Sequence, residues 1–313
     1  HRAMNPASPA LPTWQLYVYM TRPGFLLVTA IGCFIGLAVA ATFGSGLDAP
    51  KATATVVLAV LAHAGANVLN DYFDSRNGAD AANQQGMFPF SGGARFIQNG
   101  HVSERNTGLW GLALMGLVVA AGLLLARHSG GGLLLIGALG LLLGWAYSAP
   151  PLSLMSRGLG ELAVAACWWL VVVGADYVQR GQFFTVSACV GVSYAVMVAT
   201  ILLVCGVPDI EADRAVGKRT LATRLSPRAL AGLYLGLVVF AHVWLALLGV
   251  WAFVPSAHTR WACVALPIGL VAAWLLWHHS SERKRLKQAI VLTLVAAHVH
   301  GLGLVVGLLL PHL

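Results

Sequence analysis

Long apolar segments recur along almost the whole chain, and this pattern constrains the fold more than any other feature. Of the 313 residues, 58% are hydrophobic and 10% are charged, whereas soluble domains carry about 25% charged residues. A membrane-spanning helix needs about 20 mostly apolar residues. We therefore expect an all-α, polytopic membrane protein that forms a single domain over residues 1–313. Polar breaks divide the chain into nine expected spans, over residues 24–43, 52–72, 106–127, 131–147, 159–178, 183–206, 228–254, 259–279 and 288–310.

The positions of Lys and Arg predict how these spans are oriented. When the loops alternate between two sides, 15 of the 19 Lys and Arg fall on one side, and the others are Lys51, Arg127, Arg180 and Arg260. Cytoplasmic loops carry the excess of basic residues. The N-terminal segment, residues 1–20, is therefore expected in the cytoplasm and the C-terminus outside, as in a bacterial inner membrane. The acidic residues gather on the basic side too, which the positive-inside rule does not explain.

A first acidic cluster lies at the end of the second expected span. Asn67, Asn70, Asp71 and Asp74 have the spacing i, i+3, i+4 and i+7, so their side chains share one helix face. Asp80 follows in the next loop. The cluster therefore predicts a group of oxygen ligands at a cytoplasmic helix end.

A second acidic cluster lies at the end of the sixth expected span. Asp209 and Asp213 are i, i+4 neighbours that face together, while Glu211 points elsewhere. Both clusters are expected at C-terminal helix ends, where the negative end of the helix dipole repels carboxylates. This repeated, unfavourable arrangement indicates a bound cation.

The ligand types indicate which cation this is. Carboxylates and amides without a nearby Cys or His suit Mg²⁺ or Ca²⁺ rather than Zn²⁺, and the five cysteines lie singly without a C-x-x-C pair. The alternative is a pair of solvated helix ends that contact neighbouring arginines. That alternative explains one cluster better than it explains two.

Small and basic residues follow each cluster. A metal-bridged phosphate site requires this order of residues. The carboxylates hold Mg²⁺, Mg²⁺ holds phosphate oxygens, and Arg or Lys neutralises the remaining charge of the phosphate. Positive-inside topology alone is the alternative explanation for the second basic run. The residues after the first cluster are Ser91, Gly92, Gly93 and Arg95, and those after the second are Arg214, Lys218, Arg219, Thr220 and Arg224.

These segments resemble the motifs of UbiA-type intramembrane aromatic prenyltransferases. The segment NVLNDYFDSRNGAD, residues 67–80, is similar to the first aspartate-rich motif of the family, and DIEADRAVGKRTLATRL, residues 209–225, is similar to the second. The pair Arg22-Pro23 and the segments YSAPP (147–151) and RGLGE (157–161) also match. Nine helices is the number found in the family, so the resemblance covers the whole chain.

The resemblance implies a function for each candidate residue. It implies Mg²⁺ as cofactor, a polyprenyl diphosphate and an aromatic acceptor as substrates, and a central cavity near the cytoplasmic face that shields the allylic cation from water. Catalytic roles fall to Asp71, Asp74, Asp209 and Asp213, and these four, with Asn67 and Asp80, are the implied metal ligands. The implied substrate-binding residues are Asn67, Asn70, Arg22, Ser91, Arg95, Tyr147, Lys218 and Arg219.

Within the family, two features resemble the 1,4-dihydroxy-2-naphthoate polyprenyltransferase branch, which makes demethylmenaquinone with loss of CO₂. Gly78 stands where several other branches usually carry an Asp, and the acid comes instead at Asp80. The RGLGE loop also matches this branch. The segment PFSGGARFIQNG, residues 89–100, differs from the run Arg-Pro-Leu/Ile-Pro-Ser-Gly that those other branches tend to carry, and it does not identify a branch. Another quinone or phenol precursor, such as 4-hydroxybenzoate, therefore stays open as the acceptor.

An ion-coupled secondary transporter is the competing class, because ionisable residues at membrane depth often mark ion pathways. Transporter sites usually lie near the bilayer midplane on broken helices, whereas these acids lie at the ends of spans. A break at Gly206 and Pro208 would favour the transporter. Membrane lipids are the expected surroundings, and the sequence shows neither a nucleic-acid-binding signature nor an obligate protein partner.

Overall fold

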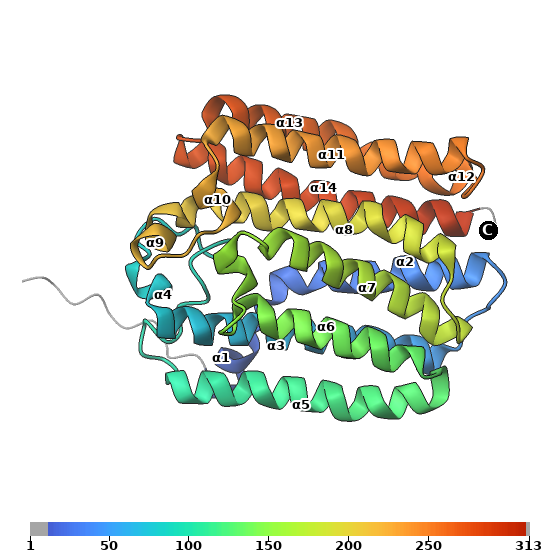
Figure 1. The fold of residues 1–313 in the computed structure, drawn as a ribbon, viewed down its shortest axis with the longest axis horizontal. Helices are drawn as coiled ribbons and strands as arrows, with labels where there is room; N and C mark the ends of the chain where they lie inside the picture. Colours follow the sequence, from blue (N-terminus) through green and yellow to red (C-terminus); the bar gives the residue numbers. More distant parts are fainter. Residues whose placement is uncertain (1–11, 311–313) are drawn as a thin grey trace, which may run out of the picture.

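The computed structural model describes residues 12–310, and within that range the chain forms helices and no strands (Figure 1). The nine longest helices lie alongside one another in a bundle. They are α2 (Pro23–Thr42), α3 (Ala49–Asn77), α5 (Glu104–Ser129), α6 (Gly132–Ser148), α7 (Gly160–Arg180), α8 (Thr185–Cys205), α11 (Pro227–Val250), α13 (Ala265–His279) and α14 (Arg283–Leu309).

Shorter elements lie before and between these helices. They are α1 (Thr13–Met20), α4 (Ala79–Ala82), η1 (Leu154–Arg157), η2 (Val207–Asp209), α9 (Ile210–Ala215), α10 (Leu221–Arg224), α12 (Ser256–Thr259) and η3 (Arg260–Val264), of which those marked η are 3₁₀-helices. Three of them, α4, α9 and α10, lie together at one end of the bundle (Figure 1).

The prediction of an all-α, multi-pass membrane protein is confirmed. Eight helices in the described range are long and apolar enough to cross a membrane. The helix α6 is also apolar but has 17 residues, so the count of nine spans and the orientation remain predictions. Of the expected N-terminal segment, residues 1–11 lie outside the described residues, and α1 follows them.

Local sequence explains where the helix that carries the first cluster begins and ends. The side chain of Asp48 accepts a hydrogen bond from the backbone N–H of Lys51 (2.9 Å) and so caps the first turn of α3. Gly78 ends the helix with a φ of 82°, a left-handed conformation that glycine adopts at little cost. The chain therefore changes direction after α3, and Asp80 lies in the short helix α4.

The second cluster differs from the prediction. The helix α8 ends at Cys205, and the chain continues through η2 into α9, so Asp209 and Asp213 lie beyond α8 rather than in its last turn. Pro208 has no backbone N–H to continue the helix. The helix-dipole argument for this cluster was therefore wrong, although both side chains still face one cavity.

Small residues allow α2, α7 and α8 to pack closely behind the site. A Cβ atom at Gly36 of α2 would lie 2.2 Å from the carbonyl oxygen of Val172 in α7. Close approach at small residues is a common way for membrane helices to associate. On α8, Tyr194 is fully buried and its hydroxyl donates to the carbonyl oxygen of Val28 in α2 (2.6 Å). These contacts fix the three helices relative to each other.

Candidate functional site

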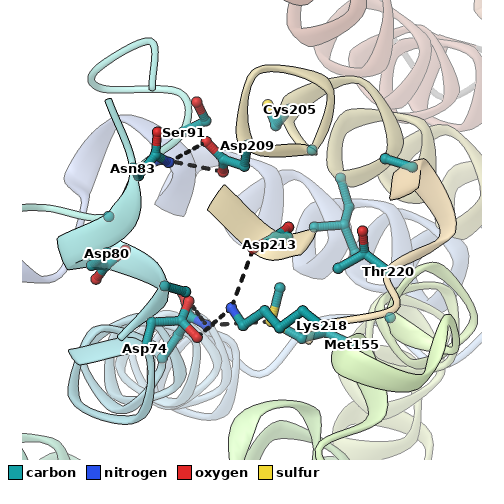
Figure 2. Close-up of a pocket in the computed structure, with 18 of the residues that line it drawn as sticks. Asp74, Asp80, Asn83, Ser91, Met155, Cys205, Asp209, Asp213, Lys218 and Thr220 are labelled. Atoms are coloured by element: carbon teal, nitrogen blue, oxygen red, sulfur yellow. Dashed lines mark hydrogen bonds and ion pairs between the residues drawn. The ribbon is translucent and has the colours of Figure 1, made fainter. Parts of the chain in front are cut away.

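A polar cavity of about 100 Å³ lies at the end of the bundle that carries α4, α9 and α10. Both acidic clusters line it, although they are separated by more than 120 residues along the chain (Figure 2). The predicted site residues that line this cavity are Arg22, Asn70, Asp74, Asp80, Ser91, Tyr147, Asp209, Asp213 and Lys218.

Lys218 joins the two clusters. Its Nζ atom donates to Oδ1 of Asp74 at 2.5 Å and lies 3.7 Å from Oδ1 of Asp213. Burial lowers the pKa of Lys218, but the carboxylates of Asp74 and Asp213 raise it by more, so this pKa lies above its ordinary value. A permanent positive charge therefore sits between the tips of α3 and α9.

Arg22 provides a second cation beside the first cluster. It forms an ion pair with Asp71 and donates to Oδ1 of Asn70 (3.3 Å). Arg22 precedes α2 with a φ of 54°, and Pro23 begins the helix, a position where the missing N–H of proline is not needed. Asp71 is buried and does not line the cavity; it also faces the backbone N–H of Ala94 at 3.4 Å.

Asp80 has the least satisfied carboxylate of the site. It is 4% exposed, and within residues 12–310 its Oδ2 atom finds no hydrogen-bond partner. Burial, together with the nearby Asp74 and Asp71, raises the pKa of Asp80 to about 8. Such an uncompensated buried carboxylate is costly, and a bound cation would offset that cost.

Asp209 is held by the loop that follows the first cluster. Asn83 donates its side-chain amide to Oδ1 of Asp209 (2.7 Å), and the backbone N–H of Gly92 faces Oδ2 at 3.3 Å. Ser91 supports this loop by accepting from the backbone N–H of Met87 (2.9 Å). The sequence interpretation missed Asn83; its position three residues after Asp80 in a glycine-rich loop was the available signal.

Besides Asp71, three predicted residues lie outside the lining of the cavity. Asn67 donates its amide to the carbonyl oxygen of Thr21 (2.9 Å). Arg95 donates to the carbonyl oxygens of Asp80 (3.0 Å) and Asn83 (3.4 Å), so in this structure it holds the loop. Arg219 is exposed. Their predicted roles as ligands of metal or diphosphate remain predictions.

The donor set fits Mg²⁺ that is shared with phosphate. Within the described residues, no three acidic, His or Cys side chains converge closely enough to enclose an ion by themselves. Mg²⁺ is usually held by one or two carboxylates together with substrate phosphates and water. Two separated carboxylate groups and the orphaned oxygen of Asp80 match that pattern better than a site made of protein alone.

A second, apolar cavity of about 580 Å³ lies farther along the same helices. On α3 it is lined from Thr55 to Ala66, whereas the polar cavity begins at Asn70. On α6 and α7 the order is the same, because Gly144 and Trp168 line the apolar cavity while Tyr147 and Glu161 line the polar one. The two cavities therefore follow each other along the bundle, with the polar one at the end.

Comparison with known protein families gives one match that covers most of the chain. Residues 26–304 match the model of the UbiA prenyltransferase family. This range contains both acidic clusters and the glycine-rich loop between them.

Curated relatives are similar over about 70% of the chain. A 1,4-dihydroxy-2-naphthoate octaprenyltransferase from Mycobacterium tuberculosis is 31% identical over 224 residues, which cover 71% of this chain and 70% of the relative. The protein of the same name from Bacillus subtilis is 27% identical over 232 residues, which cover 74% and 71%. A digeranylgeranylglyceryl phosphate synthase from Natronomonas pharaonis is 32% identical over 234 residues, which cover 72% and 74%.

Solved structures share the fold. A UbiA homolog from Aeropyrum pernix K1 in its apo state superposes with a TM-score of 0.67 at 17% identity, over 90% of this chain and 98% of the other. A UbiA homolog from Archaeoglobus fulgidus bound to GPP and Mg²⁺ gives a TM-score of 0.59 at 16% identity, over 92% and 99%.

Proposed function

The chain belongs to the UbiA prenyltransferase family, and we propose that it transfers a prenyl group from a polyprenyl diphosphate to 1,4-dihydroxy-2-naphthoate, with Mg²⁺ as cofactor. The observation that carries this proposal is that both acidic clusters line one cavity and are joined there by Lys218. The choice of acceptor is supported by the names of the relatives from Mycobacterium tuberculosis and Bacillus subtilis. In this reaction the acceptor loses its carboxylate as CO₂.

The carboxylates and cations of the polar cavity would receive the diphosphate. Asp74 and Asp80 on one side and Asp209 and Asp213 on the other would hold the metal, with Asp71 fixed behind them by Arg22. Bound Mg²⁺ would supply positive charge that stabilises the departing diphosphate. Lys218 adds a fixed cation of its own, which is the kind of preorganised charge that lowers a barrier at a developing anion.

The apolar cavity would receive the hydrocarbon tail. Its lining is almost entirely aliphatic, mainly from α3, α5, α6 and α7, and it follows the polar cavity along the bundle. A tail that lies there removes apolar surface from water. The same walls exclude water from the allylic carbon, so that the acceptor ring attacks it rather than a water molecule.

With the orientation proposed from the basic residues, this site would lie at the cytoplasmic face of a bacterial inner membrane. Lys218 and Arg283 belong to the basic side, and both lie at the site end of the bundle, where Arg283 donates to the carbonyl oxygen of Gln85 (2.9 Å). Soluble substrates would enter from that side. Membership of a prenyltransferase family favours this enzyme over the transporter alternative.

A glyceryl phosphate acceptor is a second candidate, because the relative from Natronomonas pharaonis is named digeranylgeranylglyceryl phosphate synthase. 4-Hydroxybenzoate is the third acceptor to test, because it serves other branches of the family. Both share the diphosphate chemistry of the first candidate. They differ in the product.

Mass spectrometry of the products separates these candidates. The purified protein in liposomes would be offered each acceptor with prenyl diphosphates of several lengths, with Mg²⁺ or with EDTA, beside an Asp74→Asn control. We expect a Mg²⁺-dependent product whose mass is that of the prenylated, decarboxylated naphthol, and none from the control. A product with another acceptor alone would overturn the choice of substrate, and none with any acceptor would overturn the proposed function.

A further inference from the structure

The apolar cavity contains one small polar group, at the end nearest the polar cavity. This group consists of Thr29 from α2, His63 from α3 and Trp168 from α7. All three side chains line the cavity. The other residues of its wall are mostly aliphatic or glycine. A hydrocarbon tail offers nothing to such a group, so its presence needs another explanation.

The three residues lie at one level of the bundle, just beyond the reaction site. Thr29 is seven residues after Arg22, His63 is eight residues before Asp71, and Trp168 is seven residues after Glu161. At a rise of 1.5 Å per residue, each offset corresponds to about 10–12 Å along its helix. The polar group therefore faces the boundary between the two cavities, where the carbon that leaves the diphosphate would lie.

The contacts of this group leave hydrogen-bonding capacity unused. Oγ1 of Thr29 lies 2.9 Å from Nδ1 of His63, and the rings of His63 and Trp168 meet edge to face with centroids 4.8 Å apart. Within residues 12–310, the buried indole nitrogen of Trp168 finds no acceptor. Its neighbour Trp169, in contrast, donates to the carbonyl oxygen of Ala188 (2.8 Å).

An unpartnered indole N–H beside a cavity is expected to bind a ligand oxygen. Buried donors are almost always satisfied in folded proteins, because an unmade hydrogen bond costs free energy. The edge of Trp168 that carries the N–H faces α2, since a Cβ atom at Gly32 would lie 3.8 Å from its Cδ1. Trp168 itself lines the cavity, and changes of side-chain rotamer at a binding site are common when a ligand binds.

We propose that Trp168 and His63 bind an oxygen of the aromatic acceptor and so position its ring against the prenyl carbon. This inference rests on the proposed function. Among the substrates of that reaction, the tail carries no oxygen and the diphosphate lies in the polar cavity. The remaining oxygens are those of the acceptor, namely its two hydroxyl groups and the carboxylate that it loses as CO₂. Trp168 donates, and His63, held by Thr29, presents its second ring nitrogen to the same oxygen or its proton.

The test compares Trp168→Phe with Trp169→Phe as a matched control. Both variants remove an indole N–H from adjacent positions of α7, but Trp169 does not line the cavity. Loss of one hydrogen bond corresponds to about a tenfold change in a binding constant. We expect Trp168→Phe to raise the KM for 1,4-dihydroxy-2-naphthoate about tenfold and to leave the KM for the prenyl diphosphate unchanged, and Trp169→Phe to change neither.

Acceptor analogues sharpen the test. Two acceptor analogues each lack one hydroxyl group, at position 1 or at position 4. For one of them, the KM of the wild type should rise about tenfold, and Trp168→Phe should show no further rise in KM for that same analogue. If Trp168→Phe does not accumulate in the membrane, His63→Leu carries the same test with the same expected rise.

The outcomes separate this inference from the proposed function. An active wild type whose Trp168→Phe variant keeps its acceptor KM, or raises both KM values equally, would overturn the binding role and leave the function intact. A wild type that prenylates no aromatic acceptor would overturn the proposed function itself. The selective rise in acceptor KM is the result that supports both.

Discussion

The Nζ atom of Lys218 donates to Oδ1 of Asp74 at 2.5 Å, across 144 positions of sequence. The same Nζ atom lies 3.7 Å from Asp213. Because both carboxylates are buried, this single cation compensates charge on two separate helices. Lys218 therefore links the two halves of the site.

Two acidic residues of α9 provide a direct test of which carboxylates act. Asp213 is 5% exposed and lines the polar cavity, whereas Glu211 is exposed on the same short helix. We expect Asp213→Asn to lower kcat/KM by about 100-fold or more, the loss typical of removing one group aimed at developing charge. Glu211→Gln should change it by less than about twofold, since exposed charges contribute little. Similar losses in steady-state prenyl-transfer assays of the two variants would contradict the assignment.

The glycine-rich loop predicts a second pair of variants. Gly93 and Gly100 have nearly the same φ, 73° and 74°, but a Cβ atom at Gly93 would lie 2.7 Å from Oδ2 of Asp80, while one at Gly100 would meet nothing within 4 Å. Gly100→Ala should therefore show only the conformational cost of about 1–2 kcal/mol. Gly93→Ala should lose more stability and also displace Asp80, so that activity falls. Thermal unfolding in detergent and prenyl transfer measure the two effects, and equal behaviour of the variants would contradict the close approach.

The stability of the metal-free protein should depend on pH through Asp80. Burial, with Asp74 and Asp71 nearby, raises its pKa in the folded protein to about 8, so between its ordinary pKa and 8 the folded state holds a proton that the unfolded state has lost. Stability contributed by this proton is present at low pH and is lost as the pH rises through 8. We expect the melting temperature in EDTA to fall between pH 6 and pH 9, and to fall less in Asp80→Asn. If the melting temperatures of both proteins depended on pH in the same way, the raised pKa of Asp80 would be contradicted.

A buried ion pair at the opposite end of α7 predicts a loss of stability without a change in substrate binding. Oδ1 of Asp176 lies 2.8 Å from Nη2 of Arg180, and Ser187 donates to Oδ2 at 2.9 Å. Removing one partner of a buried pair costs about 3–5 kcal/mol. Asp176→Ala should therefore melt at a much lower temperature than Asp48→Ala, which loses only a helix cap worth about 1 kcal/mol. Both variants should keep the wild-type KM values in the transfer assay. Equal melting temperatures of the two variants would contradict the larger contribution expected of the buried ion pair.

Periodicity and polar breaks in the sequence predicted the helices well, because lipid-facing and buried segments alike must be apolar. The expected sixth span ended at residue 206, one residue from the end of α8 at Cys205. The sequence could not predict that Asp209 lies in η2 and Asp213 in α9, since that depends on how the chain continues after Pro208. The expected eighth span over residues 259–279 likewise begins as α12 and η3 before α13 starts at Ala265.

Residue types and spacing predicted most of the charged residues that line the cavity, but not which of them pair with each other. Lys218 was expected beside phosphate, and the structure shows in addition that it joins Asp74 to Asp213. Arg95 was expected at phosphate too, but its guanidinium holds the carbonyl oxygen of Asp80. Such contacts depend on the path of the loop in three dimensions, which spacing along one helix does not contain. The same is true of Asn83.

Calorimetric titration with an uncleavable thiolo analogue of a prenyl diphosphate tests most directly whether the two clusters bind one ligand together. We predict binding to the wild type in Mg²⁺, no measurable binding in EDTA, and at least about 100-fold weaker binding to both Asp74→Ala and Asp213→Ala, which remove one carboxylate from each cluster. Full affinity in either variant, or binding that ignores Mg²⁺, would contradict a shared metal–diphosphate site.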